Sequence, residues 1–151
     1  MPSSPPSDAR LRLIAESYQR LTGKPLLTEM PQMDDELRNA MWHAPFAIVA
    51  HGTEDDPIFF YGNLYALQNF EMSFEEFAQL PSRLSAEPVV QEAREAALAK
   101  VAQRGYIDGY SGMRVAKSGR RFMITDCTIW NLLDAQGGFH GQAAIFVARA
   151  Y

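Results

Sequence analysis

The sequence predicts one α+β domain, in which a five-stranded antiparallel sheet carries a helical cluster on one face and an additional N-terminal helix. Helical and strand-like patterns do not alternate along the chain, which excludes a doubly wound parallel sheet. The last three apolar segments are separated by tight turns, and strands joined in this way pair antiparallel. The 151 residues include 47% hydrophobic and 21% charged side chains, which is enough for one core and excludes disorder over most of the chain.

Two helices are expected ahead of the sheet. Residues 1–7 are rich in proline and serine and are expected to form a loose tail. A helix over residues 8–22 follows from an N-cap at Asp8, stop signals at its end and a helical apolar stripe of Leu11, Ile14, Tyr18 and Leu21. A second helix is expected over residues 34–43. These helices form a predicted N-terminal extension over residues 8–45, and the main domain is expected over residues 46–151.

A β-hairpin and a group of helices should follow. Short apolar runs over residues 46–50 and 58–61 flank a polar, turn-rich segment, which is typical of a hairpin. Asn63 is placed to cap a short helix, and Ser73 with Glu76 matches a capping box. A longer helix is expected over residues 87–104, with Ala97, Leu98 and Val101 on its apolar face.

Three strands are expected at the end of the chain, over residues 106–115, 121–133 and 139–149. The middle strand is apolar at both even and odd positions, so both faces of the sheet should be covered. Strict alternation would place Ile124 and Trp130 on the same face. The 8–22 helix is too short to be stable alone, and we expect it to cover the outer face and help form a homodimer.

Composition excludes several function classes. The net charge of −4 does not fit a nucleic-acid-binding protein, which normally has a basic surface. No stretch approaches the roughly 20 apolar residues of a membrane span, so we expect no membrane contact. Cys127 is the only cysteine, which excludes an intramolecular disulfide and a cysteine-ligated zinc site. The N-terminus has no apolar signal-peptide core, and a cytoplasmic location is expected.

The order of elements resembles that of PAS domains, as do the strand ending at Asn63 and the helix start at residues 72–77. Residues 51–57, 80–88, 108–112 and 130–134 resemble the MEKHLA domain family, a PAS-related group, in its stand-alone bacterial form. The resemblance covers about residues 40–150, although the literal MEKHLA hexapeptide is absent. The same domain ends the plant class III homeodomain-leucine zipper regulators. The resemblance implies a PAS-like fold and a sensor or interaction role, and it brings no established catalytic residues.

The resemblance also implies a pocket between the sheet and the helical cluster. We predict that the pocket binds a small apolar or aromatic ligand and that the domain signals through dimer or partner contacts. The residues predicted to line this ligand site are Tyr61, Leu67, Phe77, Leu84, Met113, Ile124 and Trp130.

No metal, haem or flavin cofactor is expected. His43, His51 and His140 are scattered without metal-ligand spacing. In PAS sensors a haem histidine usually lies on the long helix and a photoactive cysteine lies before it, and residues 80–104 contain neither.

Two alternative functions stay open, although the sequence favours a role without catalysis. One is a small cone-shaped α+β enzyme, a hydrolase or isomerase, in which a partly buried Asp126 acts as the acid. Against this, Asp126 could simply pair with Arg114 or Arg121 across the sheet. The other alternative is a dimerisation module without a ligand.

Overall fold

The computed structural model describes residues 7–86 and 88–150. Two helices lead the chain, α1 (Asp8–Thr22) and α2 (Asp34–Trp42), in agreement with the predicted ranges. The N-cap of α1 is Ser7 rather than Asp8, because the Ser7 hydroxyl accepts a hydrogen bond from the Arg10 backbone N–H at 3.2 Å. Asp8 lies in the first turn, where its charge complements the helix dipole. Apart from Ser7, the tail predicted over residues 1–7 lies outside the described residues.

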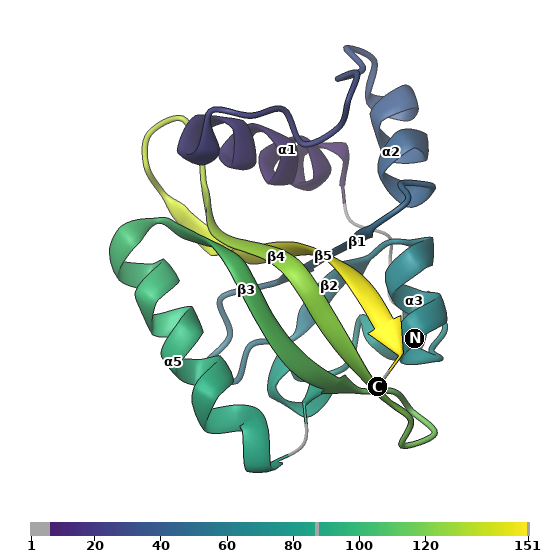
Figure 1. Cartoon of the computed structure of the whole chain (residues 1–151). Helices are drawn as coiled ribbons and strands as arrows, with labels where there is room; N and C mark the ends of the chain where they lie inside the picture. Colours follow the sequence, from purple (N-terminus) through teal and green to yellow (C-terminus); the bar gives the residue numbers. More distant parts are fainter. Residues whose placement is uncertain (1–6, 87, 151) are drawn as a thin grey trace.

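Five strands form one antiparallel sheet, as predicted: β1 (Ala47–His51), β2 (Phe59–Gly62), β3 (Tyr106–Val115), β4 (Arg121–Leu133) and β5 (Phe139–Ala150). Their order across the sheet is β2-β1-β5-β4-β3. The last strand therefore lies in the centre, between the first strand and the β3–β4 hairpin (Figure 1).

The helical cluster follows β2 and consists of α3 (Leu64–Phe70), α4 (Phe74–Phe77), the 3-10 helix η1 (Ser82–Ser85) and α5 (Pro88–Arg104). Asn63 determines where this cluster leaves the sheet. Its Oδ1 accepts hydrogen bonds from the backbone N–H groups of Ala66 and Ile48, and its Nδ2 donates to the carbonyls of Met41 and Phe46. The predicted capping box of Ser73 and Glu76 is present. None of the helices in the described part of the chain is long and apolar enough to cross a membrane.

Both faces of the sheet are covered, as the apolar pattern of the middle strand predicted. Figure 1 shows α1 across one side of the sheet and α5 along the other. On the α1 side, the ring of Trp130 meets Tyr18 edge to face at 4.9 Å, and its indole N–H donates to the Ile14 carbonyl at 3.3 Å. The outer face is therefore covered by α1 of the same chain, while the homodimer stays a prediction.

A β-bulge at Asp126 changes the phase of β4. Asp126 has a positive φ of 53°, and the register with β5 shifts between Thr125 and Thr128. Ile124 and Cys127 consequently both face the helical cluster, whereas Trp130 faces α1. The extra residue of a bulge reverses the alternation beyond it, so the expectation that Ile124 and Trp130 share a face was wrong.

Asp126 itself is exposed at this bulge. Its carboxyl group does not line the space between the sheet and the helices, which removes the pocket acid of the enzyme alternative. Arg114 points into that space, on the side of the sheet covered by α5, and so is not the cross-strand partner that the sequence suggested.

Candidate functional site

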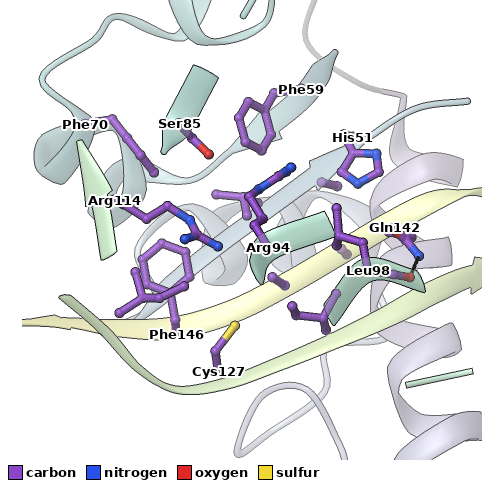
Figure 2. Close-up of a pocket in the computed structure, with 16 residues that line it drawn as sticks. His51, Phe59, Phe70, Ser85, Arg94, Leu98, Arg114, Cys127, Gln142 and Phe146 are labelled. Atoms are coloured by element: carbon purple, nitrogen blue, oxygen red, sulfur yellow. Dashed lines mark hydrogen bonds between the residues drawn. The ribbon is translucent and has the colours of Figure 1, made fainter. Parts of the chain in front are cut away.

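A small cavity of about 50 Å³ lies between the sheet and α5. Its walls combine apolar and aromatic side chains with a set of buried polar groups (Figure 2). The apolar walls include Phe59, Phe70, Leu98, Ile124, Ile129 and Phe146. The polar groups and the single thiol are His51, Ser85, Arg94, Arg114, Cys127 and Gln142.

Of the seven predicted ligand-binding residues, Ile124 lines this cavity. Phe77 and Leu67 are buried in the same core but lie behind the lining, and the Phe77 ring stacks on Phe59 at 4.2 Å. Leu84 is exposed on η1. Met113 is half-buried and precedes Arg114 along β3.

Tyr61 and Trp130 belong to the core beneath α1, on the opposite face of the sheet. A second bulge explains Tyr61: Ala50 pairs with Tyr61 and His51 with Phe59, which leaves Phe60 as the extra residue of β2. Tyr61 lines a more open hollow of about 360 Å³ beside α1, α2 and α4. Its hydroxyl is buried without a hydrogen-bond partner among the described residues, and burial raises the pKa of this phenol.

Two arginines enter the cavity from different elements, Arg94 from α5 and Arg114 from β3 (Figure 2). Their exposed fractions are only 6% and 7%. The Arg114 guanidinium donates from Nη1 to the Met113 carbonyl at 2.7 Å. Burial, and next the nearby charge of Arg114, lower the pKa of Arg94 to about 10. Within residues 7–86 and 88–150, no carboxylate lies within ion-pair distance of either guanidinium.

His51 and Cys127 add no negative charge to the site. Burial lowers the pKa of His51, so its imidazole is neutral near pH 7, and its Nε2 has no hydrogen-bond partner in the described structure. Burial also raises the pKa of the Cys127 thiol to about 12, so the thiol stays protonated. The sequence-based view of Cys127 as a small buried side chain is confirmed. The cavity offers positive charge and hydrogen-bond donors rather than an activated nucleophile.

Two buried amides attach α5 to the sheet beside the cavity. Asn131 donates from Nδ2 to the Val101 carbonyl at 3.0 Å. Gln142 donates from Nε2 to the Leu98 carbonyl at 3.3 Å and to Asn131 Oδ1 at 3.1 Å. The position of α5 is therefore linked by hydrogen bonds to the central strand β5 and to its neighbour β4.

Sequence reasoning missed the two arginines. The helical spacing offered a signal for Arg94, because it lies three residues before Ala97 and seven before Val101, within the stripe that faces the core. No comparable signal marked Arg114. Among the described residues, no group of three or more His, Cys, Asp or Glu side chains is arranged to hold a metal ion.

Comparison with known proteins gives the chain a family and a fold class. The family model of the MEKHLA domain matches residues 8–150. This match includes α1 and α2, which precede the stretches that carried the resemblance. The homeobox-leucine zipper protein HOX10 of Oryza sativa subsp. indica is 26% identical over 137 residues, which cover 90% of this chain and 16% of that protein. The chain thus spans about a sixth of the length of this relative.

Solved structures share the fold at low sequence identity. The PAS domain of a protein from Colwellia psychrerythraea matches with a TM-score of 0.63 and 18% identity, over 78% of this chain and 95% of that chain. A light-oxygen-voltage domain studied with a flavin analogue matches with a TM-score of 0.64 and 18% identity, over 80% of this chain and 89% of that chain. The α+β fold is therefore PAS-like, as predicted.

Proposed function

This chain belongs to the MEKHLA domain family, and from that premise we propose that it is a PAS-like sensor module with a small ligand between the sheet and α5. The observation that carries this proposal is the partly enclosed cavity, into which buried polar side chains project between apolar and aromatic walls. In keeping with those walls, the body of the proposed ligand is apolar or aromatic.

Ligand binding would be coupled to a movement of α5. The cavity of about 50 Å³ is well below the roughly 300–1,000 Å³ of typical small-molecule sites. A ligand of more than a few atoms must therefore displace part of the wall, and Leu98 on α5 is part of it. Displacement would strain the hydrogen bonds from Asn131 and Gln142 to the α5 backbone. Filling the cavity would thus change which position of α5 is most populated. The proposed module transmits this change through contacts with a second copy or a partner protein.

Native mass spectrometry of the freshly purified full chain tests this proposal. We expect a small mass to be retained by the wild-type protein. The variant Ala144→Leu adds three carbon atoms to the cavity wall and should lose that mass, whereas Ala102→Leu on the exposed side of α5 should keep it. Equal retention in both variants would place the bound molecule elsewhere and contradict the proposal. A stable dimer that retains no small mass and gains none from added ligands would instead support the ligand-free dimerisation module.

A further inference from the structure

The cavity holds two buried positive charges, and no carboxylate of the described residues lines it or lies within ion-pair distance of them. The charge of Glu95, the residue after Arg94, acts on Arg94 only from beyond that distance. Arg94 and Arg114 are each more than nine-tenths buried. The remaining titratable groups of the lining are His51, which is neutral because burial lowers its pKa, and Cys127, whose protonated thiol carries no charge. Buried charges normally have an opposite charge beside them, because an unpaired buried ion is costly to desolvate.

We infer that the cavity binds a small organic acid, whose carboxylate lies between the guanidinium groups of Arg94 and Arg114. This inference rests on the proposed function, because it names the ligand class for the same cavity. Guanidinium groups present several N–H donors in a planar fork that matches a carboxylate, so two of them can surround one anionic group. Figure 2 shows both arginine side chains within the ring of lining residues.

The walls of the cavity favour an organic carboxylate over an inorganic anion. Most of the side chains that line the cavity are apolar or aromatic. Phe59, Phe70 and Phe146 surround the charged groups and would contact the apolar remainder of an organic acid. They offer no hydrogen bonds to the outer oxygens of a phosphate or sulfate ion, which would be only partly solvated there.

The two unpaired arginines should also lower the stability of the ligand-free protein, which can be measured. Replacing an unpaired buried cation with an apolar side chain of similar volume removes a desolvation penalty. The variants Arg94→Met and Arg114→Met should therefore fold and should be at least as stable as the wild type without ligand. Arg104→Met is a matched control, because Arg104 is exposed at the end of the same helix.

Thermal unfolding of the full chain with acetate, benzoate, the neutral isostere benzamide, and inorganic phosphate tests the inference. At a concentration of about ten times its dissociation constant, benzoate should raise the midpoint temperature of unfolding of the wild type by roughly 3–6 °C. Benzamide and phosphate should leave this temperature unchanged. Acetate should act in the same direction at higher concentration. The benzoate effect should disappear in Arg94→Met and Arg114→Met and persist in Arg104→Met, with circular dichroism confirming that all three variants are folded.

The possible results separate this inference from the proposed function. Equal stabilisation by benzamide and benzoate, or a benzoate effect that survives in Arg94→Met, would overturn the carboxylate site and leave a sensor of neutral ligands. Stabilisation by phosphate alone would overturn the choice of an organic acid. No response to any probe, together with no small mass retained in native mass spectrometry, would overturn both the inference and the proposed function.

Discussion

Trp130 is the strongest test of the contact between α1 and the outer face of the sheet. Its side chain is fully buried, meets Tyr18 edge to face and donates a hydrogen bond to the Ile14 carbonyl. Replacing it with alanine removes the whole indole and leaves a cavity beneath α1. Substitutions of this kind cost about 3–5 kcal/mol of unfolding free energy. Trp130→Phe keeps an aromatic ring and loses mainly the indole hydrogen bond and some contact area, so we expect about 1–2 kcal/mol.

Urea denaturation followed by circular dichroism measures these losses, and Trp42→Phe is the control. Trp42 is half-buried at the end of α2, so its replacement should cost less than about 1 kcal/mol. A double-mutant cycle of Tyr18→Ala and Trp130→Ala should give a coupling of about 0.5–1.5 kcal/mol. A loss below about 1 kcal/mol for Trp130→Ala, or strictly additive effects in the cycle, would refute the packing of α1 on this face.

Three further predictions concern the backbone and the cavity. Gly141→Ala should cost more than about 3 kcal/mol, because φ is +123° and the new Cβ would lie 2.1 Å from the His51 carbonyl oxygen. Gly137 is the control, because its φ is +82° but the space around it is open, so Gly137→Ala should cost only about 1–2 kcal/mol of unfolding free energy. Equal losses of unfolding free energy for the two variants in urea denaturation would contradict the predicted clash at Gly141. Because burial lowers the pKa of His51 in the folded state, the unfolded chain binds more protons below about pH 6.5. The unfolding free energy should therefore fall as the pH decreases through that value, and the fall should be smaller in His51→Gln. Identical pH profiles of the unfolding free energy in the wild type and in His51→Gln would contradict this role of His51. Burial raises the pKa of the Cys127 thiol to about 12, so this thiol should not react with a thiol reagent at pH 8 in the folded protein. It should react fully once urea has unfolded the chain. Rapid labelling of the native protein would contradict this prediction, because it would show that the thiol is accessible.

Patterns within short stretches of the chain were enough to predict the order and type of the elements and several of their ends. The cap at Asn63 and the capping box of Ser73 and Glu76 could be read directly, because these signals act between residues at most three apart. The apolar residues on both sides of β4 also predicted a sheet covered on both faces. The site prediction instead combined two arguments: Leu67 and Phe77 were placed on helices expected to lie over the sheet, and strict alternation along the middle strand placed Ile124 and Trp130 on one face.

Which side chains meet in the cavity depends instead on how distant segments of the chain pair and pack. The extra residues Phe60 and Asp126 reverse the alternation of β2 and β4, which moves Tyr61 and Trp130 to the α1 face. A bulge forms where one strand accommodates its partner, so its position depends on pairing between segments far apart in the chain. Arg94 and Arg114 likewise come together only when α5 packs against β3. A local pattern cannot reveal such pairs, because the free energy that buries them comes from contacts between elements rather than from either segment alone.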